Sequence, residues 1–203
     1  MNTKTARAVL AALCVVPMSG CTALAPVDTD TRKYVLSSLP PEDQPGPPGQ
    51  HMSLLILVPE SNRVYDTTRM AYSTQAYQIA YFSQNEWAET PSRMMLPLMV
   101  AAISNTHHFE QVLAPPDFGR HSFALRSEIV DLKQDFTVEP PTLRFTMRFH
   151  LRRETDNEIV ATREVSVRQA MHDRTPYAGV LAANEAAAKI LRDLAAFVAE
   201  KAR

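Results

Sequence analysis

The side chains with the greatest chemical potential in this 203-residue sequence are two cysteines and six histidines. A thiolate is a nucleophile and a metal ligand, and an imidazole carries protons or binds metals. The histidines are scattered, and the adjacent pair His107 and His108 begins a predicted strand, where neighbours point to opposite faces and cannot share an ion. The sequence has no G-x-S-x-G, P-loop or H-E-x-x-H pattern. We therefore predict no catalytic residue, no metal site, no cofactor and no enzymatic activity.

Both cysteines lie near an N-terminal segment with the features of an export signal. Lys4 and Arg7 precede an apolar run at residues 8–16, which has the length of a secretory signal core. The run is far too short to span a bilayer, because about 20 apolar residues are needed. Cys14 lies inside this run and would be removed with it, whereas Cys21 follows the run.

Residues 18–21, Met-Ser-Gly-Cys, resemble the lipobox of bacterial lipoproteins, in which a cysteine after two small residues is acylated and becomes the mature N-terminus. The resemblance implies lipidation of Cys21 with palmitate-like chains, and two or three such chains anchor a protein stably. An Asp after this cysteine commonly retains lipoproteins in the inner membrane; here Thr22 follows, which favours the outer membrane. The alternative is an ordinary signal peptide with an incidental cysteine.

Removal of a signal peptide at residues 1–20 takes Lys4 and Arg7 away and leaves 19 basic against 22 acidic residues, a net charge near −3. This balance argues against nucleic acid, which is bound by basic domains. The remaining length fits one domain. We predict a lipidated N-terminus and short tether at residues 21–33, whose polar part reaches at most about 40 Å, and one domain over residues 34–201.

Alternating apolar and polar residues predict most of the strands. The clearest lies at residues 143–153 and is expected to pair with residues 159–171 as a hairpin. Residues 121–136 alternate but change phase near Val130, as a β-bulge would. Residues 53–60 form a continuous apolar run, typical of a strand buried on both faces. Further strands are predicted at residues 33–39, at residues 69–87 as a hairpin ending at Trp87, and at residues 108–113.

Two segments show helical spacing. Thr90 and Pro91 are suited to begin the first helix as N-cap and first helical residue, and Pro97 should kink or restart it. Residues 176–201 carry an apolar face that should cover the dry face of the sheet. We therefore predict an α+β fold, with a mostly antiparallel sheet covered on one face by two helices in a single two-layer domain.

Two surface features are candidates for binding. One is a basic stripe on the outer face of the strand at residues 143–153, suited to anionic headgroups or an acidic partner, with a solvated face as the alternative; it comprises Arg144, Arg148 and Arg152. The other is the aromatic hairpin at residues 69–87, since aromatic residues are enriched at interfaces. We predict partner contact there, with core packing as the alternative, at Tyr72, Tyr77, Tyr81 and Trp87.

The order of these motifs resembles a known family. A lipobox is followed by "YVL", a strand ending in "VPE", the hairpin "AYQIAYFSQNEWAETP" and a helix leading to "NTHHFEQVL". This pattern, over residues 34–197, is similar to the ABC-type transport auxiliary lipoproteins, the PqiC-like lipoproteins of MCE-type lipid transport systems. Thr90 before Pro91, and Pro97 within the helix, depart from the family pattern and affect local geometry.

The resemblance implies a non-enzymatic outer-membrane lipoprotein that faces the periplasm and is anchored through Cys21. It would dock or seal an MCE protein bridge at the outer membrane and so support intermembrane lipid transport, with the ATPase and permease on separate chains. The implied partner is an MCE-domain protein of the same system, and phospholipid and a second copy of the chain are further candidates. The alternative is an envelope lipoprotein that regulates or assembles another machine, such as a cell-wall synthase.

Overall fold

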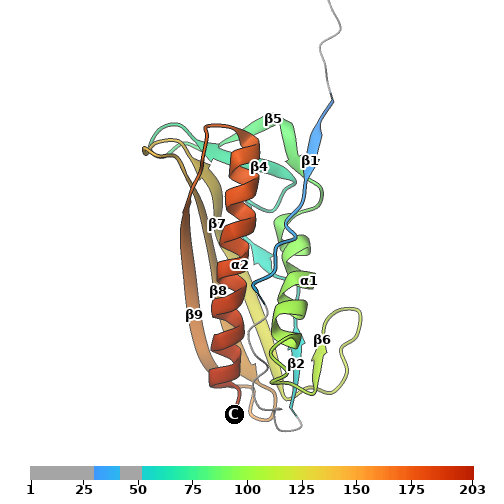
Figure 1. Ribbon diagram of the computed structural model, residues 1–203. Coiled ribbons are helices and arrows are strands. Elements are labelled where there is room, and N and C mark those ends of the chain that lie inside the picture. The colour runs from blue at the N-terminus through green and yellow to red at the C-terminus, as the bar shows by residue number, and fades with distance from the viewer. Residues whose placement is uncertain (1–29, 42–51) are drawn as a thin grey trace, which may run out of the picture.

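Nine strands form one mixed sheet around a long central strand, β7 (Phe123–Asp135), in a computed structural model that describes residues 30–41 and 52–203 (Figure 1). β8 (Thr142–Arg153) pairs antiparallel with β7 along its whole length, and β9 (Ile159–Ala170) pairs antiparallel with β8. These are the longest strands of the sheet, and they set the long axis of the molecule.

The other side of β7 is covered by three short strands that follow one another along it. β2 (Ser53–Ile56), β3 (Glu60–Ser61) and β4 (Arg69–Ser73) pair in turn with the beginning, middle and end of β7. All three run parallel to β7. The chain from residue 53 to residue 73 therefore travels the length of the sheet and reaches the end at which β7 finishes.

The sheet extends differently at its two ends. Beside β2, the short strand β6 (Gln111–Leu113) adds in parallel. Beside β4, the strand β5 (Ala80–Trp87) returns antiparallel as a hairpin, and β1 (Arg32–Tyr34) pairs in parallel with β5. The first described strand thus lies at the hairpin end of the molecule (Figure 1).

The prediction of a mostly antiparallel sheet is wrong. Five strand pairings are parallel and three are antiparallel. Sequence patterns detect hairpins because their two strands are neighbours in the chain, whereas parallel pairs join distant segments through long connections. A signal was present in the continuous apolar run at residues 53–60, because runs of this kind are typical of buried parallel strands.

Several local predictions within the strands are confirmed, although the strand predicted at residues 33–39 is present only as β1, Arg32–Tyr34. The pairing of β7 with β8 shifts register between Ile129 and Asp131, at the predicted bulge. Residues 69–87 form the β4–β5 hairpin, and β8 with β9 forms the second one. In β8, alternate side chains are buried while their neighbours are half-exposed, except that Thr146 of the outer set is also buried.

Both predicted helices are present, as α1 (Pro91–Ser104) and α2 (Pro176–Lys201). Each begins with a threonine N-cap followed by proline, although only Thr175 uses its side chain, which accepts a hydrogen bond from the Ala178 N–H at 3.2 Å. α1 passes through Pro97 as a single helix, so it does not restart there.

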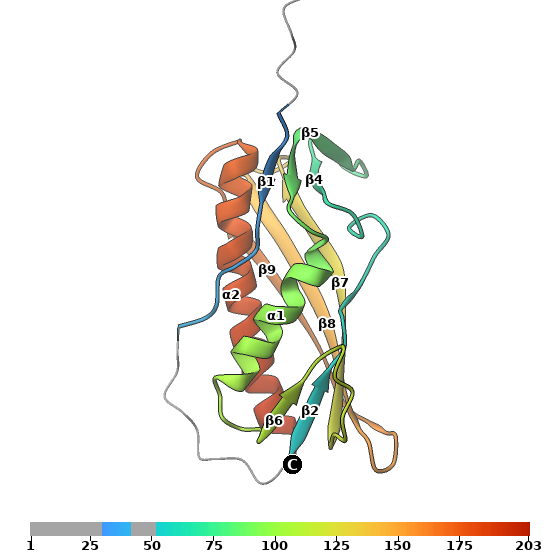
Figure 2. The ribbon, with the colours of Figure 1, turned by 90° about the vertical axis from the view of Figure 1, so that its right-hand side faces the viewer.

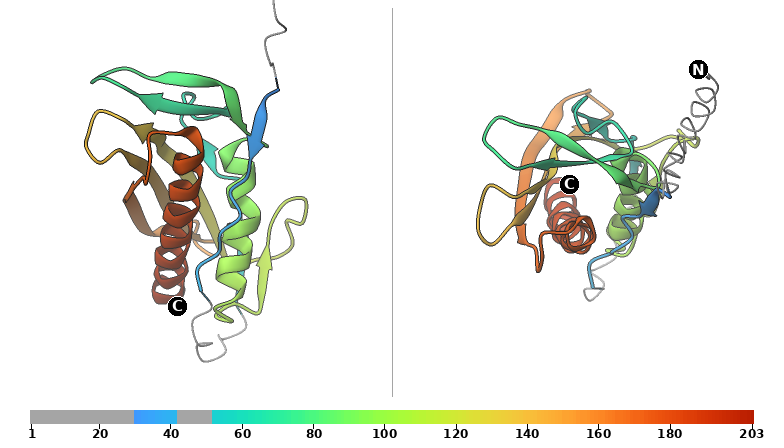
Figure 3. Two further views of the ribbon diagram at one scale, coloured as in Figure 1. Left: turned by 45° about the horizontal axis from the view of Figure 1, so that its top comes forward. Right: turned by 90° about the horizontal axis from the view of Figure 1, so that it is seen from above.

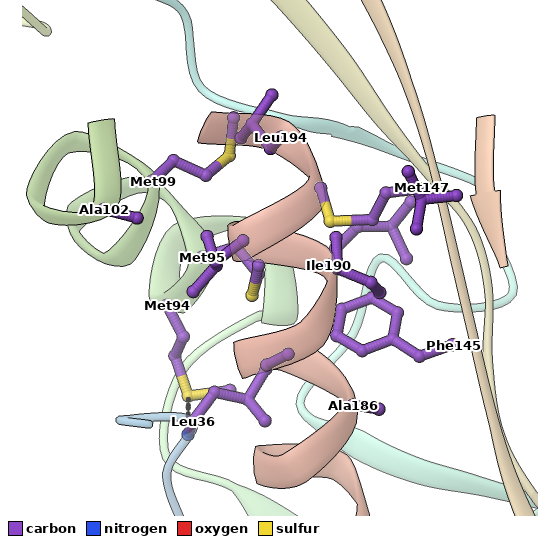
Figure 4. Close-up of a cluster of buried hydrophobic side chains, with 14 of the residues drawn as sticks. Leu36, Met94, Met95, Met99, Ala102, Phe145, Met147, Ala186, Ile190 and Leu194 are labelled. Carbon is purple, nitrogen blue, oxygen red and sulfur yellow. Dashed lines mark hydrogen bonds between the residues drawn. The ribbon is translucent and has the colours of Figure 1, made fainter. Parts of the chain in front are cut away.

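The two helices lie on the same face of the sheet (Figures 2 and 3). α2 packs across β8 and β9, and α1 packs against α2 and beside β2 and β6. Side chains such as Phe145 on β8 and Ile190 on α2 meet in a fully buried layer (Figure 4). Burial of a side chain of this size contributes about 1.5–3 kcal/mol. Because the helices cover this face, the opposite face of the sheet is the outer one.

Candidate functional site

The predicted lipidation residue, Cys21, lies outside the described residues, which begin at Asp30. The fold does place the segment that leads to it. β1 lies alongside β5, with Arg32 opposite Asn85 and Tyr34 opposite Trp87. β1, the first strand of the described chain, lies at the hairpin end of the domain (Figure 1).

After β1 the chain forms a strap, residues 35–38, that lies against the helices. Leu36 is its buried residue and inserts beside Met94 and Met95 of α1, next to α2 (Figure 4). The backbone N–H of Leu36 points to the Met94 sulfur at 3.5 Å. Through Leu36 the strap joins the helical part of the core, and not only the sheet.

One side chain of α2, Asn184, holds the strap from the outside. Its Oδ1 accepts hydrogen bonds from the backbone N–H groups of Ser37 at 2.8 Å and Ser38 at 3.1 Å. Its Nδ2 donates to the carbonyl of Val35 at 3.1 Å. An amide is suited to this role because it offers a donor and an acceptor together. The sequence analysis did not identify Asn184, since nothing near it in the chain indicates a partner at residue 35.

The four hairpin aromatics predicted to contact a partner occupy different environments. Trp87 is 4% exposed and belongs to the core, so the alternative of core packing applies to it. Tyr81 is half-buried, and its hydroxyl donates to the carbonyl of Val64 at 3.0 Å. Tyr72 is also half-buried. Only Tyr77, at the tip, is fully exposed, so the prediction of partner contact rests mainly on this residue.

Tyr72 belongs to an aromatic cluster that sequence reasoning missed. Its ring stacks on Phe82 of β5, with centroids 4.4 Å apart, and meets Phe136 edge-on at 6.1 Å. The Arg174 guanidinium lies 5.8 Å from the Phe136 ring. Phe136 follows β7 and comes close only because β4 and β7 are paired in parallel. Only the parallel pairing of β4 with β7 could have indicated this cluster, and the hydrophobic pattern did not predict that pairing.

Two arginines of the predicted basic stripe are paired with carboxylates of neighbouring strands. Arg148 lies 3.1 Å from Glu128 on β7 and 2.8 Å from Glu164 on β9. Arg152 lies 3.5 Å from Glu154 in the following turn. These ion pairs neutralise much of the positive charge of the stripe. Binding of anionic headgroups or of an acidic partner there stays a prediction.

The third arginine, Arg144, belongs to a polar network on the outer face of the sheet. It lies 3.0 Å from Asp131 and 3.9 Å from Asp135. Asp131 also accepts a hydrogen bond of 2.7 Å from the hydroxyl of buried Tyr65. The backbone N–H of Thr137 donates to Asp135 at 3.0 Å. Every charge of this network has a partner, as buried polar groups require.

The network shifts the pKa values of Tyr65 and Asp135 in opposite directions. Burial, and next the hydrogen bond to Asp131, raises the pKa of the Tyr65 phenol far above its ordinary value. Burial alone would raise the pKa of Asp135, but hydrogen bonds from Thr137 and the charge of Arg144 bring that pKa below its ordinary value. Tyr65 is therefore a neutral donor and Asp135 an anion at neutral pH, which suits a structural role.

The part of the chain that the structure describes contains no group of three His, Cys, Asp or Glu side chains able to hold a metal ion. His108 lies with its Nε2 3.1 Å from the carbonyl of Ala202, so it joins the chain after α1 to the end of α2. Within the same described residues, no helix is long and apolar enough to cross a membrane.

The α+β domain described above, with two helices on a mixed sheet and an N-terminal strap, coincides with the part of the chain that matches one family model. The chain belongs to the ABC-type transport auxiliary lipoprotein components, because the model of that family matches residues 34–195. This match confirms the family resemblance found in the sequence, and it makes the protein a transport auxiliary component. No curated protein sequence matches the chain.

Crystal structures of other proteins share the fold. Protein XCC0632 from Xanthomonas campestris has a TM-score of 0.74 at 18% identity, over 84% of this chain and 96% of that one. The hypothetical protein CT253 from Chlamydia trachomatis has a TM-score of 0.50 at 9% identity, over 75% of this chain and 98% of that one. At such identities the likeness shows the fold alone.

Proposed function

We propose that this protein is a non-enzymatic outer-membrane lipoprotein subunit of an MCE-type lipid transport system. It docks or seals the periplasmic MCE bridge at the outer membrane. The observation that carries the proposal is the family match over residues 34–195, which includes α1, most of α2 and almost the entire sheet. The anchor is Cys21, acylated after removal of residues 1–20.

The fold supports a role as an anchored docking domain. The described chain begins at one end of the domain with β1, and Asn184 holds the strap that follows. The domain therefore has a defined point of attachment. The outer face of the sheet carries charges that are already paired with one another. Charges that are already paired within the domain leave little net charge to attract a charged partner, so this face suits recognition by shape and hydrogen bonding.

The proposal is tested by affinity purification of the full-length protein, tagged after Arg203 and extracted from envelopes with a mild detergent. Mass spectrometry should identify an MCE-domain protein and co-extracted phospholipid. The control is Cys21→Ser, which cannot be acylated on a thiol and should lose the outer-membrane fraction and the partner together. Intact mass of the purified chain reports the acyl groups directly.

Two other results would contradict the proposal. Recovery of a cell-wall synthase would support the alternative, a lipoprotein that regulates or assembles another envelope machine. Recovery of the bait alone, from a protein whose mass shows acylation, would remove the support for a docking role. An unacylated mass would refute the anchor while leaving the family assignment in place.

The predicted contact of the hairpin with a protein partner is tested in the same purification. Tyr77→Ser removes the one fully exposed aromatic ring of the hairpin, and Phe118→Ser removes an exposed ring from the loop at the other end of the sheet. If the hairpin contacts the MCE protein, only Tyr77→Ser should reduce its recovery. Equal recovery with both variants would count against a protein contact at the hairpin.

A further inference from the structure

The tip of the β4–β5 hairpin combines two unfavourable features in one residue. Tyr77 has a relative exposure of 109% and a backbone φ of 64°. Bulky residues rarely adopt this left-handed conformation, which glycine or asparagine would accept more easily. The fold gains no burial from the ring in return. A strained and exposed aromatic side chain of this kind points to a use outside the domain.

Tyr77 does not stand alone, because the turns that follow β4 and β7 lie at the same end of the sheet. Ser73 is opposite Asp135 in this parallel pair, and the N–H of Phe136 donates to Ser73. The exposed and half-buried apolar side chains gathered at this aromatic end are Tyr72, Tyr77, Phe82, Phe136, Val138 and Tyr177. Their elements lie together at one end of the molecule in Figures 1 and 3.

The N-terminal chain leaves the domain at this same end. The Tyr34 ring of β1 lies 6.0 Å from the Tyr177 ring at the start of α2. From Tyr34 the chain runs back through Arg32 to Asp30, away from the helix (Figure 2). The aromatic end and the exit of the chain therefore coincide.

The length of chain before Asp30 restricts how an anchored domain can be oriented. Cys21 is nine residues from Asp30, so with β1 in place the two are at most about 32 Å apart. α2 has 26 residues and is about 39 Å long, and it runs from the aromatic end to the opposite end of the molecule. An anchor at Cys21 therefore cannot hold the domain upright with that opposite end on the membrane.

We propose that the aromatic end rests on the lipid surface of the membrane in which the protein is anchored, with Tyr77 at the level of the headgroups. The inference rests on the acylation of Cys21 in the proposed function. Tyrosine suits this position because its ring is apolar and its hydroxyl remains hydrated. Since Arg174 is paired with Glu139 at 2.8 Å, the contact depends on the rings more than on charge. It should therefore change little with salt.

The test uses the acylated full-length chain in phosphatidylcholine vesicles that contain a lipid with brominated acyl chains. Trp87 is the only tryptophan and is buried, so the unmodified protein gives the background. Tyr77→Trp places a reporter at the aromatic end, and Phe118→Trp places one in the loop at the opposite end, where the native ring is 61% exposed. The expected result is a blue shift and strong quenching for Tyr77→Trp, and neither for Phe118→Trp.

Three results would overturn the inference. These are absence of quenching with Tyr77→Trp, equal quenching with both variants, or a shift that needs added MCE-domain protein, which would assign the tip to a protein contact. The first measurement uses vesicles without any transport partner, and the MCE-domain protein is added only in a second measurement. A failure here is therefore distinct from a failure to purify an MCE protein, and an unacylated mass would refute the shared assumption for both.

Discussion

At the scale of single residues, Asn184 connects the helical layer to the segment that leads to the proposed anchor. Three backbone groups of the strap depend on its one amide. Because the strap is partly exposed, water can replace these hydrogen bonds in part. Each bond is then worth about 0.5–1.5 kcal/mol.

Asn184→Ala should therefore lower the free energy of unfolding by about 1–3 kcal/mol, because the loss of three such bonds is partly offset by the better helix propensity of alanine. The main effect should be local, with faster hydrogen exchange at the N–H groups of Ser37 and Ser38. Glu185→Ala, at an exposed neighbouring position on α2, serves as the control and should leave those amides unchanged. Unchanged exchange in Asn184→Ala would show that Leu36 alone holds the strap.

Asp135 gives the polar network a pH dependence with a definite sign. Its pKa is lower in the folded protein than its ordinary value of 3.8. The charged form therefore stabilises the fold above that value, and this contribution disappears as the pH falls through the folded pKa. Asp135→Asn keeps a side-chain acceptor for Thr137 but removes the charge.

We expect the urea midpoint of Asp135→Asn to be lower than that of the native protein at pH 6. The difference should shrink as the pH falls below about 4. Asp193→Asn, on the exposed face of α2, is the matched control. A constant difference across the whole range would mean that packing, and not charge, accounts for the effect.

The environments of the hairpin tyrosines show why residue types alone could not define the candidate site. Tyr72, Tyr77 and Tyr81 all lie in one hairpin, yet one ring stacks, one is fully exposed and one donates to a loop carbonyl. The three environments differ because different segments contact these side chains, such as the loop with Val64 and the turn with Phe136. Those contacts follow from the parallel pairs, which the hydrophobic pattern did not predict.

At the scale of elements, α2 lies close to the sheet at Gly179. A Cβ atom at this position would clash with the side chain of Gln134, which is 2% exposed on β7. The Gln134 amide donates to the carbonyl of Pro176 at 3.1 Å, so it cannot easily turn aside. The glycine is needed for this close contact between helix and strand.

Gly179→Ala should destabilise the protein by about 1–3 kcal/mol through overpacking, although alanine is the better helix former. In the background of Gln134→Ala the same change should become neutral or stabilising. A double-mutant cycle by urea denaturation measures this coupling. Additive effects of the two substitutions would show that the helix moves aside without cost.

The elements themselves were largely predictable from the sequence. Both helices, the two hairpins and the bulge in β7 leave local patterns, because periodicity and capping act between neighbours in the chain. The pairing of β1 with β5, and of β2, β3 and β4 with β7, has no such local signature. The order of strands, and with it the aromatic end, therefore required the structure.

At the scale of the whole molecule, the position of the aromatic end separates two causes of membrane contact. If the short tether alone pressed the domain onto the lipid, a Gly/Ser insertion between Thr22 and Asp30 that doubles its length should abolish the quenching of Tyr77→Trp. If the rings bind lipid themselves, most of the quenching should remain. We expect the second outcome, measured in the same vesicles, with an inserted Phe118→Trp chain as the control.

The junction of β1 with the domain also has a mechanical consequence. A pull on the proposed anchor acts along β1, while the hydrogen bonds to β5 lie across that direction, so they are loaded in shear and resist together. The junction is nevertheless small, since only three residues of β1 are paired, with the strap bonds to Asn184 behind them. Under load between two membranes, this junction would therefore separate before the packed core of α2, β8 and β9 unfolds.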